Sequence, residues 1–425
     1  MNRNWRKSTL CVQGGYSPKV GEPRVLPIYQ STTYKYDDPE KLAHIFDLKE
    51  EGHIYSRISN PTVSAFEEKI AQLEGGVGAL ATSSGQAAIT LAILNICSQN
   101  EHILALSTLY GGTHTLFSAT LKKLGIEVTF VEPTLSIEEI LSCAKLNTKA
   151  IYAETIGNPA LNVLDFEKFS SVAKKLDVPL IIDNTFATPY LCQPFKYGAN
   201  IIIHSATKYI DGHANNVGGI IVDGGNFNWN NGKYPELTEP DQSYHGIKYY
   251  EEFKEKAFIA KTRSQLLRDI GCTLSPFNAF MLNIGLETLH LRMERHSENA
   301  LKLAEYLDLH EKVSWVNYPG LRTHSDHKLA QKYLPNGASG ILTFGLKGGK
   351  DAAKKLMTKL NLVALVVHVG DARTSILHPA TTTHKQLSYE DLKKSGVSED
   401  MIRVSVGIEA IDDIIDDFQR ALNLV

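Results

Sequence analysis

Short apolar runs alternate with longer amphipathic runs through the middle of the chain, from residue 78 to residue 222. The short runs are rich in Ile, Val, Leu and Ala, as buried strands are, whereas the longer runs repeat apolar residues at helical spacing. Strands that alternate with helices predict an α/β domain around a mostly parallel sheet. The predicted strands are VGALATSS, HILALS, EVTFVE, KAIYAE, PLIIDNT and ANIIIHS.

The flanking regions follow different patterns. Residues 1–60 show weak periodicity and many turns, and resemble an arm more than a domain. Residues 277–307 have long helical periodicity and are expected to link two domains. Beyond them, the strand-like runs GILTFGL, ALVVHVGD and MIRVSVGI precede an amphipathic helix, IDDIIDDFQRALNLV. We therefore expect an arm at 1–60, a large domain at 61–271 and a smaller α/β domain at 272–425.

Composition and charge narrow the function classes. The chain has 425 residues, more than one hydrophobic core usually serves, and its 43% hydrophobic and 21% charged residues are typical of a globular protein. A net charge of -3 gives no basic footprint for nucleic acid or an anionic membrane. Small anionic ligands, which need only a local site, stay possible.

The cysteines and the apolar runs bear on location. Five scattered cysteines without a C-x-x-C pair predict neither a disulfide framework nor a zinc site, and favour a reducing, cytoplasmic setting. No apolar run is long enough to cross a bilayer, and the N-terminal MNRNWRKSTLCVQGG lacks an apolar core. His204, His213 and His378 are not clustered as metal ligands would be, so we expect no metal.

The segment TSSGQAAITLAIL, residues 82–94, passes from a strand end into a helix through Ser83, Ser84 and Gly85. Free amides and the dipole at a helix start attract anions, and glycine lets an anion approach the backbone. Serine also caps ordinary helices, so this segment alone does not separate an anion site from a structural cap.

Lys208 lies in IIIHSATKYIDGHANNVGGIIV, between two β-branched apolar runs. It is a solvated loop charge, an ion-pair partner or a reactive amine. Asp183, in LIIDNTFATP, directly follows a buried strand, where ligands bind in α/β sheets, although turn residues are also found there. Lys208 follows Asp183 by 25 residues, after the next strand, so both can face one cleft. Ser205 and Thr207 add hydroxyl groups beside the lysine.

An amine, a carboxylate, hydroxyl donors and a glycine at a helix start together meet the needs of pyridoxal phosphate. The lysine forms the Schiff base, the carboxylate pairs with the pyridinium nitrogen, and the donors hold the phosphate. Tyr110, in STLYGGTH, can stack on the ring, or is a half-buried aromatic only. Arg403, in the apolar run MIRVSVGIE, can grip an amino-acid carboxylate; an ion pair with Glu409 is the alternative.

The motifs ETIGNP, DNTFATP and HSATKYIDGH strongly resemble the Cys/Met-metabolism group of fold-type I pyridoxal-phosphate enzymes, and the resemblance runs over nearly the full chain. It implies a mostly parallel sheet in a large domain with a smaller C-terminal domain. It also implies that Lys208 is the Schiff-base lysine, Asp183 the ring-nitrogen partner, and Tyr110 the stacking and catalytic residue. The remaining implied roles are phosphate binding by Gly85, Gln86, Ser205 and Thr207, cofactor contacts by Asn158 and Thr185, and substrate binding by Arg403 and Asn158.

The segment IYSRISNPT, residues 54–62, resembles the part of these enzymes that reaches a neighbouring subunit. The resemblance implies that Tyr55 and Arg57 bind the neighbour's phosphate, with Tyr55 also near the substrate, and that the active site is complete only in an oligomer. A tetramer built from two dimers is the implied assembly. Considered alone, Tyr55 and Arg57 are a surface pair of little energetic value.

Family members eliminate or replace groups at Cβ or Cγ of amino acids. The excursion GKYPELTEPDQSYHG, at 232–246, and the segment after it resemble the sulfhydrylase branch, which makes homocysteine from O-acetylhomoserine and sulfide for methionine biosynthesis. Gly112 stands where methionine γ-lyases place a cysteine. His368 departs from the small or amide residue of many sulfhydrylases. O-succinylhomoserine sulfhydrylase, cystathionine γ-synthase and a non-catalytic cofactor-binding scaffold are the alternatives.

Overall fold

The larger part of the molecule is built on a seven-stranded sheet of strand order β1-β7-β6-β5-β4-β2-β3. The computed structural model describes residues 5–385, 390, 392 and 395–425. Only β7 runs antiparallel to its neighbours, while the other neighbouring strands are parallel. The strands are β1 Gly78–Thr82, β2 His102–Leu106, β3 Glu127–Val131, β4 Thr148–Glu154, β5 Leu180–Asp183, β6 Ile201–His204 and β7 Gly219–Asp223. The predicted mostly parallel α/β fold is confirmed.

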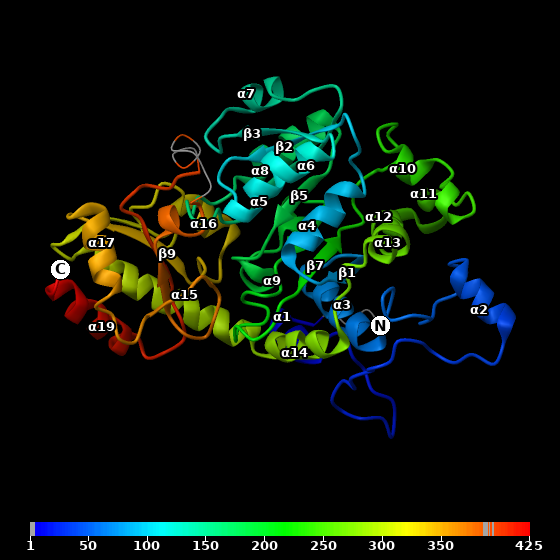
Figure 1. Cartoon of the computed structure of the whole chain (residues 1–425), viewed down its shortest axis with the longest axis horizontal. Helices are drawn as coiled ribbons and strands as arrows, with labels where there is room; N and C mark the ends of the chain where they lie inside the picture. The colour runs from blue at the N-terminus through cyan, green and yellow to red at the C-terminus, as the bar shows by residue number, and fades with distance from the viewer. Residues whose placement is uncertain (1–4, 386–389, 391, 393–394) are drawn as a thin grey trace.

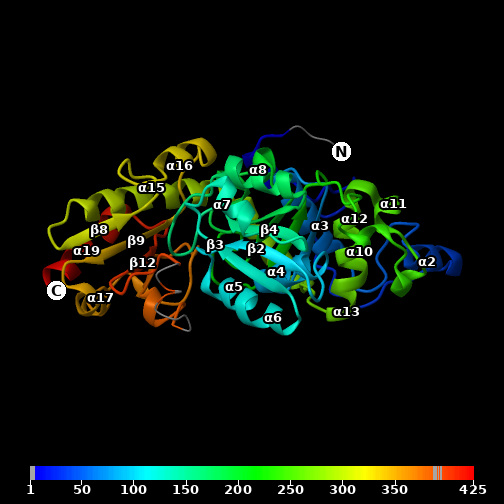
Figure 2. The same cartoon turned by 90° about the horizontal axis from the view of Figure 1, so that it is seen from above.

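Helices cover both faces of this sheet, which explains why its strands are apolar runs without a polar face. Every residue of β4, β6 and β7 is buried. Figure 2 shows α8 on one face and α4, α5 and α6 on the other. The helices that follow strands β1 to β4 are α4 Gly85–Leu94, α5 Gly111–Thr115, α6 Leu121–Lys123, α7 Ile137–Ser142 and α8 Phe166–Leu176. Other helices of this part are α3 Pro61–Glu74, α9 Thr188–Leu191, α10 Pro235–Thr238, α11 Tyr249–Phe253, α12 Ala257–Lys261 and α13 Arg268–Ile270.

The C-terminal part carries a second, five-stranded sheet, seen at the left of Figure 1, with the order β10-β11-β12-β9-β8. Its strands are β8 Val313–Asn317, β9 Ile341–Leu346, β10 Ala364–Leu365, β11 Ser375–Leu377 and β12 Ile402–Ser405. Its helices are α15 Leu289–Asp308, α16 His327–Tyr333, α17 Gly349–Met357 and α19 Ile411–Asn423. This arrangement confirms the smaller α/β part with a closing helix.

One local prediction was wrong. The run ALVVHVGD is strand only over Ala364–Leu365, because the chain then turns through Gly370, whose φ of 78° is left-handed. The helical periodicity predicted at 277–307 is confirmed, as two helices, α14, Pro276–Glu287, and α15, which are divided at Thr288. The buried residues of α14 pack in the first hydrophobic cluster, and the second cluster begins within α15 at Ala300.

The first sixty residues have two short helices. Helix α1, Lys7–Gln13, packs on the large part and buries Cys11 completely. Helix α2, Pro39–Phe46, lies at the end of the molecule opposite the C-terminal sheet (Figure 1). Within the described ranges, no helix is both long and apolar enough to cross a membrane.

Candidate active site

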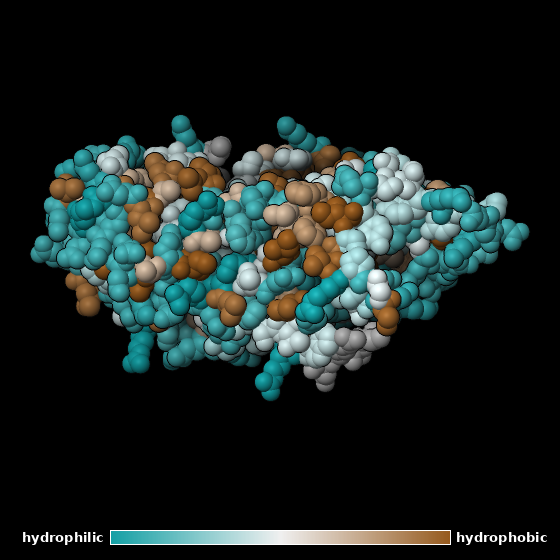
Figure 3. Space-filling view, turned by 90° about the horizontal axis from the view of Figure 1, so that it is seen from below, coloured by the Kyte–Doolittle hydropathy of each residue, from teal (hydrophilic) through white to brown (hydrophobic). Residues whose placement is uncertain are grey.

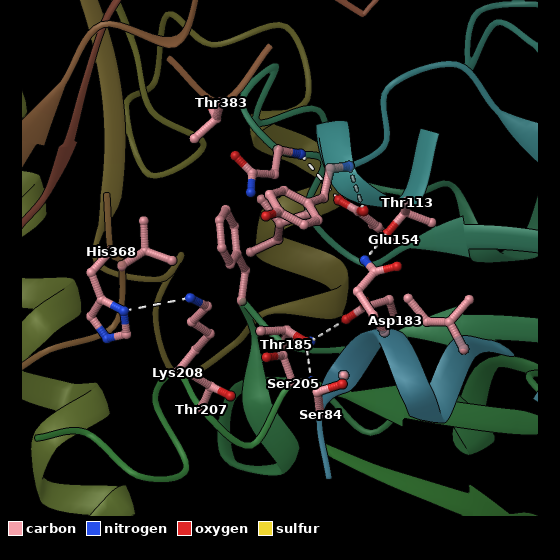
Figure 4. A pocket seen from close by; sticks show the side chains of 18 of the residues that line it. Ser84, Thr113, Glu154, Asp183, Thr185, Ser205, Thr207, Lys208, His368 and Thr383 are labelled. Carbon is pink, nitrogen blue, oxygen red and sulfur yellow. Dashed lines mark hydrogen bonds between the residues drawn. The ribbon is translucent and has the colours of Figure 1, made fainter. Parts of the chain in front are cut away.

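A pocket opens at the carboxyl ends of the parallel strands, where the fold class predicts ligands to bind (Figure 4). One wall comes from the ends of β4, β5 and β6, and the other from the C-terminal part through Arg403 and the loop that carries His368. Ten of the predicted site residues line this pocket: Gly85, Gln86, Tyr110, Asn158, Asp183, Thr185, Ser205, Thr207, Lys208 and Arg403.

The start of α4 forms one end of the pocket. Ser84 is the N-cap, and its Oγ accepts a hydrogen bond from the Ala87 amide at 3.1 Å. A Cβ atom on Gly85 would lie 2.7 Å from the Cβ of Ser205, so only glycine fits at the first helical position. The first amides of a helix have no intrahelical acceptor, and the helix dipole adds positive potential there. This end of the pocket therefore suits an anion such as a phosphate.

Asp183 is held in place at the end of β5. Its Oδ1 accepts a hydrogen bond from the Thr185 amide at 2.9 Å, and the Tyr152 hydroxyl donates to Oδ2 at 3.4 Å. Burial raises the pKa of Asp183 above its usual value, while the hydrogen bonds from Thr185 lower it. A buried, oriented carboxylate of this kind suits a cationic partner such as a protonated ring nitrogen.

Lys208 projects into the pocket from the loop after β6. Its Nζ lies 3.5 Å from Nδ1 of His368 (Figure 4), and none of the ion pairs in the described part of the chain includes it. Burial, and then the charge of Arg403, lowers the pKa of Lys208 to about 8. A partly buried amine that loses its proton this readily is a nucleophile and a base near neutral pH. Of the three interpretations of Lys208, the geometry therefore supports the reactive amine.

Arg403 is almost fully buried in β12, where it is 3% exposed. Its Nη1 donates to Oδ1 of Asn158 at 2.8 Å. The alternative ion pair with Glu409 is not formed, because Glu409 accepts from the amide and the hydroxyl of Thr374 at 2.6 and 2.8 Å. Burial lowers the pKa of Arg403 to about 10. A buried guanidinium without a carboxylate partner is costly, and an amino-acid carboxylate would compensate for that cost.

Several pocket residues escaped the sequence reasoning. Glu154 ends β4 as Asp183 ends β5, and the two are register partners, so the strand-end rule could have found it. Burial and the charge of Asp183 raise the pKa of Glu154 well above its usual value. Thr113, Phe186 and Thr383 also line the pocket, and they stand in no pattern that distinguishes them from other helix or loop residues.

His368, to which the sequence assigns no role, lines the pocket beside Lys208. Burial, followed by the charge of Lys208, lowers its pKa to about 4, so the ring is neutral at neutral pH. Gly370 packs the loop of His368 tightly against the lysine, since a Cβ atom there would lie 2.8 Å from the amide nitrogen of Tyr209.

Tyr55 and Arg57 do not line this pocket. Arg57 lies 5.2 Å from the centre of the Tyr55 ring and donates to the carbonyl of Arg268. Both side chains are exposed. Within one chain they are therefore apart from the other predicted site residues.

The pocket fits the cofactor that the sequence motifs imply. An amine, a carboxylate for a ring nitrogen and an anion cradle that admits only glycine lie in one cavity, and each comes from a different strand end. These are the groups that hold pyridoxal phosphate covalently, electrostatically and through its phosphate.

Comparisons with known proteins extend this picture. Residues 8–423 match the family described as Cys/Met metabolism PLP-dependent enzyme. The chain is 48% identical to the O-acetyl-L-homoserine sulfhydrylase of Leptospira meyeri, over 99% of this chain and 98% of that protein. It is also 48% identical to O-acetyl-L-homoserine sulfhydrylase 1 of Thermus thermophilus, over 98% and 100%. A crystal structure of a putative O-acetylhomoserine (thiol)-lyase from Campylobacter jejuni, which carries N'-pyridoxyl-lysine-5'-monophosphate, superposes with a TM-score of 0.96 at 38% identity and covers 99% of this chain and 100% of that one.

Proposed function

Because this chain belongs to the Cys/Met-metabolism family of enzymes that depend on pyridoxal phosphate, we propose that it is an O-acetylhomoserine sulfhydrylase. The reaction converts O-acetyl-L-homoserine and sulfide into L-homocysteine and acetate, a transferase step of methionine biosynthesis. The observation that carries this proposal is the 48% identity, over nearly the full length, to proteins named for this activity. The pocket supports it with groups suited to the cofactor and to an amino acid.

The cofactor, when bound, supplies a carbon that bonds amines and a ring that withdraws electrons from the substrate. Lys208 bonds the cofactor at rest, and its released amine takes the proton from Cα of the substrate and later returns it. The lowered pKa of about 8 leaves a larger share of this amine neutral near neutral pH than an ordinary lysine would have. Asp183 holds positive charge on the ring nitrogen.

The anion end of the pocket holds the phosphate. We assign this role to the start of α4 and the loop after β6, through Gly85, Gln86, Ser205 and Thr207. With the cofactor bound, Tyr110 would stack on the ring and assist the departure of acetate, and Thr185 and Asn158 would contact the ring or its oxygen. Two arguments support these roles: the lining of the pocket and the resemblance of the motifs.

Arg403 binds the carboxylate of the amino acid in this proposal. Its burial, its 2.8 Å bond to Asn158 and the lack of a carboxylate partner among the described residues support the role. In this proposal Asn158 serves both cofactor and substrate, because it lines the pocket and its side chain contacts Arg403.

The assembly we propose is a homotetramer of two dimers, in which the arm at 1–60 brings Tyr55 and Arg57 to the neighbour's pocket. The exposure of both side chains, away from the pocket of their own chain, supports this. Residues 1–4 of the arm lie outside the described residues. The domain bounds 61–271 and 272–425 belong to the same proposal.

A second surface supports association between copies. Figure 3 shows hydrophobic side chains gathered near the middle of the face seen from below, and α14 lies along the lower edge of Figure 1. On α14 and α15, Phe277, Ile284 and Leu291 recur every seven residues and are 42–58% exposed. Apolar groups at this spacing and exposure are typical of interfaces.

The free state of all five cysteines supports the cytoplasmic location.

Turnover of a matrix of substrates tests the proposal. Acetyl, succinyl and phosphoryl esters of homoserine are each combined with sulfide, cysteine or methanethiol, and the products are identified by mass spectrometry. We expect homocysteine from the acetyl ester and sulfide at the highest kcat/KM. A preference for the succinyl ester, for cysteine as the nucleophile, or an absence of turnover with bound cofactor would establish one of the three alternatives instead.

A further inference from the structure

A continuous line of hydrogen bonds crosses the pocket through Glu154. Its Oε1 accepts from the amide of Tyr110 at 2.7 Å, and its Oε2 accepts from the amide of Asn158 at 3.1 Å (Figure 4). The side chain of Asn158 in turn accepts from Arg403 at 2.8 Å. One carboxyl group therefore connects the residue assigned to ring stacking with the residue assigned to the substrate carboxylate.

The two amides lie on separate loops. Tyr110 is at the N-cap position of α5, in the loop after β2, and Asn158 lies in the loop after β4. Within the described residues, a Glu154 oxygen is the acceptor for each of these amides. The Tyr110 side chain is 39% exposed, so packing alone fixes it weakly. Glu154 itself is 6% exposed at the end of a fully buried strand, and is the rigid member of the group.

The burial of the Glu154 carboxyl group carries a free-energy cost. It is buried and is the register partner of Asp183, a second carboxyl group that is partly buried. Desolvation and like charge both penalise a carboxylate there, and two backbone donors offset part of the penalty. No role in the proposed reaction requires a carboxyl group at this place, whereas the two loops do require an acceptor.

We propose that Glu154 is a positioning residue that sets Tyr110 and Asn158, and through Asn158 also Arg403, in one arrangement across the pocket. A carboxylate suits this task because both of its oxygens are acceptors, so each can take one of the two backbone donors. The functional part of this inference rests on the proposed roles of Tyr110 and Arg403. The structural part rests on the hydrogen bonds alone.

Amide hydrogen exchange of the cofactor-free protein tests the structural part directly. Glu154→Gln keeps the shape of the side chain but has one acceptor oxygen, and its NH₂ group then faces a backbone donor. We expect exchange about tenfold faster at Tyr110 or at Asn158, because one of the two bonds is lost. Unchanged exchange at both amides would overturn the proposal.

A matched control uses another glutamate that accepts a hydrogen bond from a backbone amide. Glu139 accepts a hydrogen bond from the Ser136 amide at 2.8 Å on the surface of α7. Glu139→Gln should change exchange only near Ser136 and leave turnover as in the parent. If it accelerated exchange at Tyr110 or Asn158 as strongly as Glu154→Gln, the effect would be a general loosening, and the proposal would be wrong.

A second variant tests the role of Glu154 even if Glu154→Gln folds poorly. Asn158→Ala removes the side chain that Arg403 contacts but keeps the backbone amide that Glu154 accepts from. Exchange at Tyr110 should then stay within about twofold of the parent, since Glu154 still holds both amides. A tenfold rise there would show that Glu154 is not the anchor.

The functional part has its own readout in the holoprotein. Glu154→Gln should raise KM for the amino acid or change the visible circular dichroism of the bound cofactor, because either Arg403 or Tyr110 is displaced. A fall in kcat alone, with KM, dichroism and amide exchange as in the parent, would contradict positioning. If the parent protein made no homocysteine, the proposed function would fail while the exchange result would still decide the role of Glu154.

Discussion

The two walls of the pocket are built differently. On the large-part wall, Asp183 ends β5, and Ser205 and Lys208 follow β6 of the same mostly parallel sheet, so the sheet fixes their relative positions. On the C-terminal wall, Arg403 belongs to a strand of another sheet and His368 to a loop. The cofactor end is therefore set by one rigid core, whereas the substrate end depends on a second core. Substitutions in the first wall should weaken binding of the cofactor, and substitutions in the second should weaken binding of the amino acid.

Lys208→Ala should have the largest effect, since Lys208 is assigned both the covalent bond to the cofactor and the base that acts on the substrate. Loss of the covalent bond and of the base should lower kcat by on the order of 10⁴-fold. Stopped-flow and steady-state assays of homocysteine formation measure this, with Lys123→Ala, an exposed lysine on α6, as the control. Turnover within tenfold of the parent would remove Lys208 from the mechanism.

Arg403→Ala should weaken binding of the amino acid without weakening binding of the cofactor. An unpaired substrate carboxylate costs about 2–5 kcal/mol, so kcat/KM should fall by roughly 30- to 5,000-fold, mainly through KM. Cofactor affinity, measured by fluorescence titration of the cofactor-free protein, should change by no more than about threefold. Arg295→Ala, on an exposed pair with Glu298, is the control. Equal losses at both ends would show that the walls are not independent.

Asp183→Asn should act on the opposite wall. The loss of a charge-assisted hydrogen bond, about 1.5–3 kcal/mol, should weaken cofactor binding by roughly 10- to 100-fold. KM for the amino acid, measured at saturating cofactor, should remain near the parent value. Asp269→Asn tests a surface carboxylate paired with Arg268. A rise in KM without loss of cofactor affinity would contradict the assignment of Asp183.

The smallest expected effect is on the pH dependence of the rate at which Lys208 bonds the cofactor. This effect links the two walls, because Arg403 on one wall lowers the pKa of Lys208 on the other. Only the neutral amine reacts, so the capture rate should rise as pH passes through about 8 and then level off, because Lys208 loses its proton there. Arg403→Ala removes a nearby positive charge, which favours the ammonium form, so the midpoint should move to higher pH.

Stopped-flow absorbance measures both proteins, with N-acetyl-lysine amide in free solution as the reference for titration of the cofactor itself. A midpoint that moves down in Arg403→Ala, or that coincides with the reference, would contradict the described environment of Lys208.

The difference between the walls also explains how far sequence reasoning reached. Asp183 and Lys208 could be paired because consecutive parallel strands end at the same edge of a sheet. The same rule would have found Glu154, which ends KAIYAE. The position of His368 could not be read, because Gly370 turns a strand-like run into a loop against Tyr209. Periodicity records burial along one segment but not contacts between segments that are distant in sequence.

The roles of Tyr55 and Arg57 came from resemblance alone. Their side chains lie outside the pocket of their own chain, and no pattern of apolar and polar residues within one chain indicates a contact with another copy. Thr288 illustrates a further limit. Apolar spacing continues across it, so the break between α14 and α15 is invisible to periodicity although the backbone there is not helical.

Reduction of the holoprotein with borohydride, followed by peptide mapping, tests the central claim most directly. The claim is that the amine in this pocket is the one that bonds pyridoxal phosphate. We predict that the reduced pyridoxyl phosphate group is found on Lys208, and that Lys208→Ala protein carries none. A modified peptide that contains another lysine, with Lys208 recovered unmodified, would contradict the account.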